Sequence, residues 1–484
     1  MDDAFVAPRN LDLWLNDIYQ AHRDGGTSAF LVKGVVRLVV LGFTATASTL
    51  VVGFVDWGAL RRDCAEARCD PGLRSPRGLG AVLLAAYVLG CAAYLGWRAA
   101  SLVRRHRRMA RVRTFFRRYL PDVALGDDAW AVVAEALVAL QRDEGLCLQC
   151  NTATFTTQHV AMRVLRRQNY VTALVESDAL DVGYLTPYVE WHLWFVVTTS
   201  MFAASAPQRV RLEASLVRRE ARRWCALGVV AMPFTLLFVA AHLLLRAAEL
   251  ATMREKKSSF RAWTNEAQWR LREYNEYRHV LDERLERAAA HHQRLVDGAA
   301  APRLDAVARG AQFVCGSLAG CAAAIAALDD DASTHLHVAD RSLLWWLACW
   351  TALYAAARAV GGNRKLSTPP ERQRDEELLR AHARYLPDDH AYRPLLVVLW
   401  WRALVSVATM PWRLWRWGEQ ADLLVAFLER VTVVDGPVGD VCARSRWTEG
   451  QAVESGTSKT SRSQRSFVGG GGGAVLGRSA DFFE

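Results

Sequence analysis

Four polar side chains recur along one apolar stretch near the N-terminus. Lys33, Arg37, Thr44 and Ser48 follow at steps of four, seven and four residues, so a helix would place them on one side. Ionisable groups at membrane depth are energetically costly and usually face a polar cavity or pathway. This side of the helix could therefore guide a charged group through apolar surroundings. The alternative is that Lys33 and Arg37 lie near the helix end and extend to the membrane interface.

Residues that could do covalent chemistry are sparse. The chain has no Walker phosphate loop, no H-E-x-x-H and no G-x-S-x-G motif. His335 and Asp340 form an H-x4-D pattern, but they lie in a short acidic turn and are interpreted as loop polarity. Cys147 and Cys150 form a C-x-x-C pair without a second ligand pair nearby, which does not favour a metal site. The sequence therefore predicts a protein that is not an enzyme and that needs no metal or cofactor.

The elements that would position the polar side chains are long apolar helices. A helix needs about 20 apolar residues to cross a hydrocarbon core of about 30 Å. Four windows meet this length without interruption: 30–55, 79–103, 310–328 and 343–360. Arg98, near the end of the second window, is interpreted as an interfacial anchor. The third window contains Gly316 and Gly320 in a G-x-x-x-G pattern, which allows close helix packing.

Two further apolar windows are interrupted. Pro233 lies inside 224–245, and Pro411 lies inside 395–417 together with several arginines. Proline removes a backbone hydrogen bond and bends a helix, and such breaks are tolerated where protein or water satisfies the freed groups. Basic residues flank the first of these windows at both ends, which suits a hairpin that enters the membrane and returns. The sequence therefore predicts four transmembrane helices and two re-entrant segments.

Charge sets the expected orientation. Eight arginines between positions 104 and 118 follow the second window and place that side in the cytosol. The acidic turn at 329–331 is then luminal, and both chain termini are cytosolic. The net charge is +10. The arginines of the chain cluster beside the apolar windows, where we expect them to contact anionic lipid headgroups. The membrane is therefore a better partner for this charge than nucleic acid.

These patterns predict an all-α polytopic membrane protein with a cytosolic helical domain. Its expected segments are the following: a cytosolic N-terminal segment (1–29), a first transmembrane pair (30–104), a cytosolic helical region (105–222), a re-entrant segment (223–246), cytosolic amphipathic helices (247–307), a second transmembrane pair (308–361), a cytosolic helix (362–394), a second re-entrant segment (395–417), a C-terminal core helix and loop (418–447) and a disordered tail (448–484).

Several short blocks, taken in order, resemble the autophagy-related protein 9 family. They begin with Asn10-Leu11-Asp12 and end with Val438-Gly439-Asp440-Val441-Cys442. The most specific block is Trp269-Arg270-Leu271-Arg272-Glu273-Tyr274-Asn275-Glu276, and Arg167-Gln168-Asn169-Tyr170 and Tyr385-Leu386-Pro387-Asp388 are two others. The order and spacing of these blocks around the apolar windows carry the resemblance, which covers nearly everything from Asn10 to Trp447.

The resemblance implies an ATP-independent phospholipid scramblase that acts in autophagosome formation. It implies a domain-swapped homotrimer with a central pore and a lateral branch, and a partner in the lipid-transfer protein called autophagy-related protein 2. The charged cluster of the lateral branch matches Arg254, Glu255 and Lys256, with Lys257 beside them. The implied locations are the preautophagosomal structure, cytoplasmic vesicles, the Golgi and the endoplasmic reticulum. The alternative is a trimeric membrane scaffold that recruits autophagy factors and moves no lipid.

Overall fold

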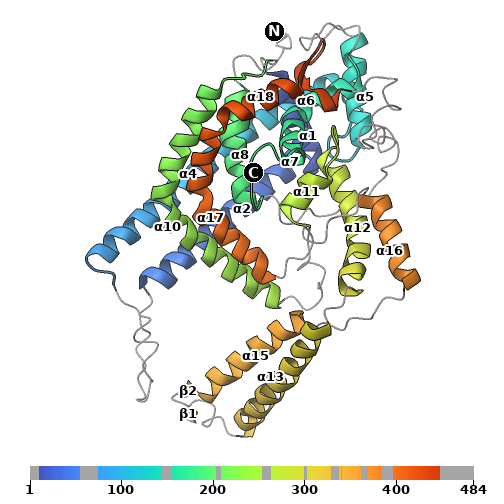
Figure 1. Cartoon of the computed structure of the whole chain (residues 1–484). Helices are drawn as coiled ribbons and strands as arrows, with labels where there is room; N and C mark the ends of the chain where they lie inside the picture. Colours follow the sequence, from blue (N-terminus) through green and yellow to red (C-terminus); the bar gives the residue numbers. More distant parts are fainter. Residues whose placement is uncertain are drawn as a thin grey trace.

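Helices make up nearly all regular structure in the part of the chain that the structure describes (Figure 1). The structure is a computed structural model, and it describes residues 10–54, 75–143, 155–202, 209–252, 263–298, 302–328, 337–338, 341–360, 369–383 and 396–446. The helices are α1 (Leu11–Arg23), α2 (Thr27–Thr49), α4 (Leu79–Tyr119), α5 (Trp130–Asp143), α6 (Thr157–Val164), α7 (Arg166–Glu176), α8 (Pro187–Leu193), α9 (Thr199–Met201), α10 (Ala214–Thr252), α11 (Asn265–Leu271), α12 (Arg278–Gly298), α13 (Pro302–Leu328), α15 (Leu343–Val360), α16 (Pro369–Ala383), α17 (Leu396–Glu419) and α18 (Ala421–Val431).

The remaining regular elements are short. π-helical turns at Leu50–Phe54 and Trp194–Thr198 continue α2 and α8, and a 3-10 turn covers Ala443–Ser445. Strands β1 (His337–Val338) and β2 (Arg341–Ser342) form one antiparallel pair. Strands β3 (Thr432–Asp435) and β4 (Gly439–Cys442) form another, in which Thr432 faces Cys442 and Asp435 faces Gly439. The described residues are therefore mostly helical, as the sequence predicts, with two short strand pairs besides.

Four described stretches are long and apolar enough to cross a membrane. They are Thr27–Thr49 in α2, Leu79–Tyr119 in α4, Ala214–Leu245 in α10 and Val307–Ala327 in α13. Three of them coincide with windows that the sequence predicts as spans. The fourth lies in α10, where a re-entrant segment is expected, whereas the apolar stretch Leu343–Ala355 of α15 is shorter.

The expected hairpin within 224–245 is wrong, because α10 is one continuous helix with Pro233 inside it. The second interrupted window is also a single helix, α17, which contains Pro411. Proline frees one backbone carbonyl, whereas reversing the chain in apolar surroundings would leave several backbone groups unpaired. The two helices also pack along each other (Figure 1). Gly228 of α10 lies where an added Cβ would be 3.6 Å from the Pro411 ring, so the two interrupted helices support one another.

The α2–α4 pair is antiparallel. The Ser48 hydroxyl of α2 lies 2.6 Å from the Tyr87 hydroxyl near the start of α4, while Gly34 near the start of α2 faces Leu102 further along α4. The Tyr87 ring in turn stacks on Phe234 of α10, with centroids 6.3 Å apart. The beginning of α2 and the arginine-rich end of α4 therefore lie on the same side of the structure, as the charge pattern predicts.

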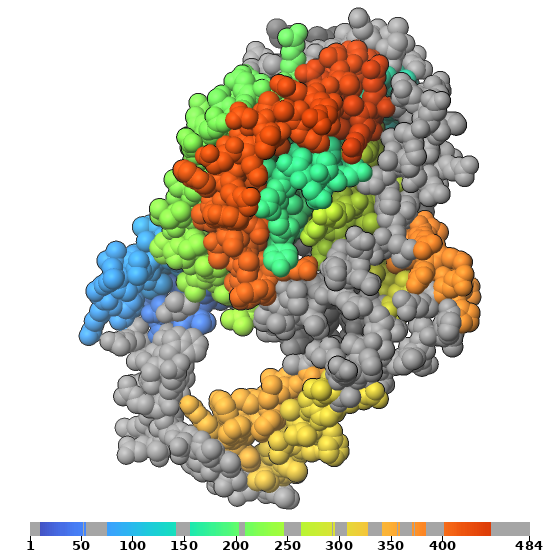
Figure 2. Space-filling view, in the orientation of Figure 1, coloured from blue at the N-terminus to red at the C-terminus, as the bar shows by residue number. Residues whose placement is uncertain are grey.

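The α13–α15 pair lies apart from the other helices, at the lower edge of Figures 1 and 2. A Cβ added to Gly316 of α13 would lie 3.3 Å from the Tyr354 ring of α15, so Gly316 permits this close approach. An added Cβ on Gly320 would meet no atom within 4 Å. The G-x-x-x-G pattern thus serves packing through its first glycine in this chain. Large apolar side chains such as Phe313, which is 76% exposed, cover the outside of the pair.

The two largest buried apolar clusters lie among the helices of the main body. In the first, Tyr170 and Leu193 pack against Trp417 of α17 and Leu428 of α18. Figure 2 shows the orange-to-red C-terminal helices bordering a blue-green surface from the middle of the chain. The second cluster joins Leu15 of α1 to residues of α4, α5 and α6. Burial of these side chains removes a large apolar area from water and drives assembly of this region.

An ion-pair cluster joins α1 to the turn between β3 and β4. Asp12 of α1 lies 2.9 Å from Arg163 and 3.0 Å from Arg166, and both arginines are buried. Arg163 also donates to the Pro437 carbonyl at 2.6 Å, and Arg166 donates to the Val438 carbonyl. The first and last blocks on which the family resemblance rests therefore meet in space.

Candidate functional site

A pocket lined by charged residues lies between α2 and α4. Its lining residues come from the turn before α2 and from facing turns of the two helices: Asp24, Phe30, Lys33, Gly34, Arg37, Leu38, Leu41, Arg98, Ser101, Leu102 and Arg105. They include four cationic side chains and one carboxylate. This α2–α4 pocket brings together Lys33 and Arg37, which the sequence analysis singles out, with two arginines of the partner helix.

Helical spacing explains which arginines of α4 face the pocket. Arg98 and Arg105 are seven residues apart, about two turns, so they project from the same face. Both are half-buried, whereas Arg104 and Arg107 on neighbouring faces are exposed. The face pattern therefore separates arginines that line the pocket from arginines that lie in solvent or at a headgroup layer.

Lys33 is anchored at one edge of the pocket. Its Nζ donates to Oδ1 of Asp24 and to the Asp24 backbone carbonyl, both at 3.1 Å. Asp24 is the C-cap residue of α1, so this contact ties the end of α1 to α2. The Lys33 side chain is 44% exposed, so its ion pair with Asp24 contributes little to stability. The pair nevertheless fixes the position of the ammonium group.

The lining of the pocket suits the binding of a small anionic group. The volume of the pocket is about 60 Å³, enough for a few water molecules or a small anionic group. Guanidinium groups present planar, paired donors that match phosphate and carboxylate oxygens. In the ranges that the structure describes, no group of three or more His, Cys, Asp or Glu residues is placed to hold a metal ion.

The other predicted residues of this helix face lie elsewhere. Thr44 and Ser48 are buried and do not line the pocket. The Thr44 hydroxyl donates to the Val40 carbonyl at 3.0 Å, and the Ser48 hydroxyl donates to the Ala45 carbonyl at 2.9 Å while bonding to Tyr87. Their hydroxyls therefore serve helix packing here, and a part for them in a lipid path stays a prediction. Arg254, Glu255, Lys256 and Lys257 lie outside the described residues.

The sequence analysis missed three polar residues of the pocket. Asp24, Ser101 and Arg105 are not candidates there, and Arg98 is interpreted only as an interfacial anchor. The seven-residue interval between Arg98 and Arg105 is a signal that could have found the second arginine. Asp24 has no such signal, because it reaches the pocket only through the turn between α1 and α2.

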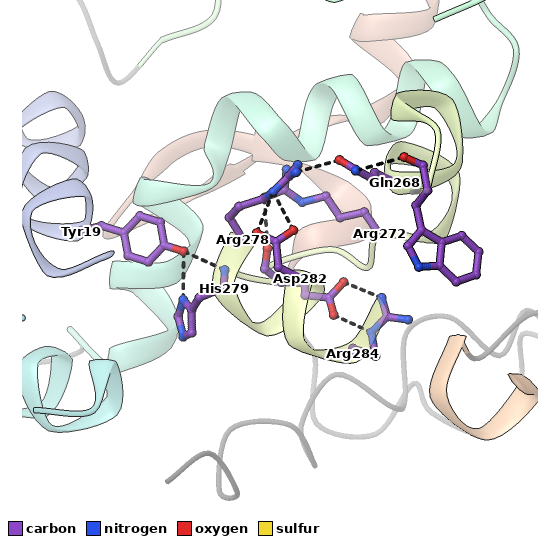
Figure 3. Close-up of polar contacts among 9 residues, drawn as sticks. Tyr19, Gln268, Arg272, Arg278, His279, Asp282 and Arg284 are labelled. Carbon is purple, nitrogen blue, oxygen red and sulfur yellow. Dashed lines mark hydrogen bonds and ion pairs between the residues drawn. The ribbon is translucent and has the colours of Figure 1, made fainter. Parts of the chain in front are cut away.

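The most specific sequence block forms a buried polar network away from the pocket (Figure 3). Arg284 binds Glu276 with two nitrogens, each 2.8 Å from a carboxylate oxygen. The same guanidinium donates to the Leu271 carbonyl at 2.8 Å and the Ala383 carbonyl at 3.0 Å, so it joins α11, α12 and α16. Arg272 donates to the Glu276 carbonyl at 3.0 Å, and burial lowers its pKa to about 10.

A histidine–tyrosine contact connects this network to α1. The Tyr19 hydroxyl lies 2.9 Å from Nδ1 of His279 and accepts from the His279 backbone N–H at 3.3 Å. Burial lowers the pKa of His279 to about 4 and raises that of Tyr19 to about 12. Tyr19 keeps its proton and His279 does not gain one, so the contact is a hydrogen bond between two uncharged groups, and the imidazole tautomer sets which of them donates. The contact holds α1 against the start of α12.

Asn275 explains another part of the block. Its φ of 58° is left-handed, a conformation that asparagine tolerates better than most residues. In this turn its backbone N–H donates to Oδ1 of Asn169 at 3.0 Å, and its side-chain amide donates to the Ser445 carbonyl at 2.7 Å. The block therefore holds α7 and the C-terminal turn together, and its role is architectural.

Comparisons with known proteins agree on one family. A family model described as "Autophagy protein ATG9" matches residues 4–447. Autophagy-related protein 9 of Arabidopsis thaliana is 25% identical over 408 residues, 75% of this chain and 46% of that protein. The Mycosarcoma maydis protein is also 25% identical, over 90% of this chain and 61% of its own length. Human autophagy-related protein 9B is 26% identical, over 94% of this chain and 55% of its own.

The fold is also similar to a solved structure. The cryo-EM structure of Schizosaccharomyces pombe Atg9 matches with a TM-score of 0.63 and 17% identity, over 91% of this chain and 99% of that one. The chain spans about half the length of the curated relatives that it matches.

Proposed function

Because this chain belongs to the autophagy protein ATG9 family, we propose that it moves phospholipids between the two leaflets of autophagosome-precursor membranes without ATP. What supports this proposal is the α2–α4 pocket, which gathers Lys33, Arg37, Arg98 and Arg105 between two helices that are apolar enough to cross a membrane. Such charges are costly at membrane depth unless they face a polar route.

The physical obstacle to lipid transfer between leaflets is the headgroup. Moving an unpaired charge through hydrocarbon costs many kcal/mol, and a polar route lowers that cost while the acyl chains stay in lipid. In the proposed path, Arg254, Lys256 and Lys257 bind phosphate and Glu255 binds the amine of choline or ethanolamine. The α2 face with Lys33 continues the path, and Thr44 and Ser48 follow along it. No energy source is needed, because the protein only speeds equilibration.

The first experiment separates a scramblase from a scaffold. The purified full chain is placed in vesicles that carry a fluorescent phospholipid in both leaflets, and a reductant that cannot cross the membrane is added. We expect the protein alone to expose the inner-leaflet label, because lipids that reach the outer leaflet are reduced. If that label stays protected in vesicles that contain the folded protein, the chain does not scramble and the scaffold becomes the better proposal.

The charged cluster has its own test in the same vesicles. Replacing Arg254, Glu255, Lys256 and Lys257 together by leucine should slow transfer strongly, because the route would lose its polar lining. The control replaces Arg219, Glu220, Arg222 and Arg223, which have the same three positive charges and one negative charge at the beginning of α10. Equal rates in the cluster variant and the unmodified chain would remove these residues from the mechanism.

We also propose that the chain acts as a domain-swapped homotrimer. The α13–α15 pair supports this, because it packs mainly on itself within the described residues and carries exposed side chains such as Phe313 and Leu353. A hairpin of this kind can bury its outer face against a neighbouring copy. The expected particle mass in detergent is three times the 53.9 kDa of one chain, measured by light scattering after subtraction of the detergent. A particle that contains one copy would contradict this assembly.

The proposed setting follows the family. The chain would lie in the preautophagosomal structure and cytoplasmic vesicles, and in the Golgi and endoplasmic reticulum, with both termini in the cytosol. Its proposed partner is the lipid-transfer protein autophagy-related protein 2. A transfer protein that delivers lipid to one leaflet requires a second activity that redistributes it, which is the activity proposed here.

A further inference from the structure

A second pocket lies where the start of α2 meets the end of α4, and it shares no lining residue with the α2–α4 pocket. Its volume is about 350 Å³, which is within the usual size of pockets that bind small molecules. Arg113 and Arg117 of α4 line it, and the described lining contains no carboxylate. We call it the arginine-pair pocket.

The two arginines carry charge that no described residue neutralises. Arg113 and Arg117 are four residues apart on one helix and are exposed, and neither has a hydrogen bond or an ion pair with another residue of the described ranges. Like charges at this spacing repel and destabilise a helix. An anion bound between them would remove the repulsion. We propose that the arginine-pair pocket binds a phosphate monoester that carries an apolar group.

A phosphate monoester matches the pocket in charge and in hydrogen bonding. It carries about 1.5–2 negative charges near pH 7, which balances two guanidinium groups, whereas a carboxylate would balance only one. Guanidinium donors also pair with phosphate oxygens in a planar, two-bond geometry. Thr27 and Ser28 add hydroxyl donors to the lining. The start of α2 contributes its positive end, because Gly26 at the N-cap has no side chain that could occupy the backbone N–H groups.

The rest of the lining indicates that the phosphate is attached to an apolar group. Leu120 and Leu125 form part of an apolar wall, and the pocket is much larger than the α2–α4 pocket. The wall is held in place by a close backbone contact. A Cβ added to Gly126 would lie 2.7 Å from backbone atoms of Gly25 and Gly26, so the loop after α4 packs directly on the turn before α2. A pocket that is already formed loses less entropy when a ligand binds.

This inference does not rest on the proposed lipid movement. A chain that binds the monoester but leaves the leaflets unmixed would overturn the proposed function alone, and the opposite result would overturn this inference alone. Two sources supply the same chemistry: a soluble phosphorylated compound, and a phospholipid whose headgroup is a phosphate monoester. The experiment separates these sources.

The experiment is a phosphorus-31 NMR titration of the full chain in a maltoside detergent, which contains no phosphorus. The probes are phenyl phosphate and inorganic phosphate. We expect phenyl phosphate to bind about tenfold more tightly, because burial of a few tens of Å² of ring surface is worth about that factor. Replacing both arginines by glutamine (R113Q/R117Q) should weaken phenyl phosphate at least about tenfold, since charge-assisted contacts are lost. Equal affinity for the two probes would overturn the apolar part of the proposal.

The matched control is R107Q/R111Q. It removes two arginines at the same spacing from exposed positions of α4 outside the pocket, and it should bind phenyl phosphate as the unmodified chain does. An equal loss in both double variants would show an effect of net charge and overturn the site.

A further variant tests the pocket without removing an arginine. Ser28→Glu places a carboxylate in the pocket, and an acidic residue in the first turn of a helix favours folding. It should abolish binding, whereas Ser28→Gln, of similar size but uncharged, should keep it. Unchanged binding in Ser28→Glu would overturn the proposal even if R113Q/R117Q does not fold.

A short-chain phosphatidic acid, added to the chain with bound phenyl phosphate, assigns the source. Displacement of phenyl phosphate at a lower concentration than inorganic phosphate requires would support the site and identify a lipid headgroup as its ligand. Retention of phenyl phosphate would support the site and identify a soluble phosphorylated compound.

Discussion

Replacing Arg284 by leucine should lower the free energy of unfolding of the described helical region by about 3–5 kcal/mol, the usual cost of removing one partner from a buried ion pair. Glu276 would be left as a buried carboxylate that has lost both of its 2.8 Å contacts with the guanidinium. The Leu271 and Ala383 carbonyls would lose the same donor. The measurement is the melting temperature of the purified chain in detergent, which we expect to fall by roughly 10 °C.

Two further variants show whether the cause is the unpaired charge. Arg287→Leu removes the same charge from an exposed i, i+4 pair with Glu283 on the same helix, and it should cost about 0.5 kcal/mol or less. The double variant Arg284→Leu with Glu276→Leu leaves no buried charge and should recover much of the lost stability. A fall in melting temperature that is equally large for Arg287→Leu would contradict this assignment.

Acidification should destabilise the chain through His279. Burial lowers the pKa of His279 from its ordinary 6.5 to about 4, and repulsion from His22 and Arg23 adds to this. The unfolded chain therefore binds a proton below pH 6.5, whereas the folded chain resists it until about pH 4. Stability is fully present above pH 6.5 and falls as the pH drops toward 4, by about 3 kcal/mol from this residue. Melting temperatures at pH 7 and pH 4.5 measure this loss.

The pH dependence has a direct check in two variants. His279→Gln should flatten the decrease between pH 7 and pH 4.5, because the side chain that takes up the proton on unfolding is gone. Tyr19→Phe removes the hydroxyl that bonds to Nδ1 of His279. It should lower the melting temperature at pH 7 yet keep the pH dependence, because the histidine and its half-buried surroundings remain. If His279→Gln keeps the full decrease, the titrating group lies elsewhere; His192, whose pKa burial also lowers to about 4, is the next candidate.

The apolar windows were predictable because their signal lies within single helices. The windows beginning at Phe30 and Leu79 reappear in α2 and α4, since transfer into an apolar environment depends on the residues of one segment. The expected hairpin at Pro233 failed for the opposite reason. Flanking charge and one proline are local signals, whereas the continuity of α10 depends on keeping its backbone bonds paired and on its contact with α17.

The candidate site was predictable only in part. The sequence placed Lys33 and Arg37 on one helix face, and the structure brings both into one pocket. It placed Thr44 and Ser48 on the same face, but the hydroxyl of Ser48 is used to pair α2 with Tyr87 of α4. The period of a helix tells which side chains share a face. It does not tell which part of that face a neighbouring helix covers.

By itself, the sequence determined the helical class, the apolar windows and the family, because these depend on composition, periodicity and the order of short blocks along one chain. Only the tertiary structure decided which charges meet. Asp12 reaches Arg163, and Arg37 shares a pocket with Arg98, across intervals that contain whole helices. Such pairings depend on how the apolar faces of distant helices pack against each other. Packing needs two complementary surfaces from different parts of the chain, so it cannot be deduced from one segment.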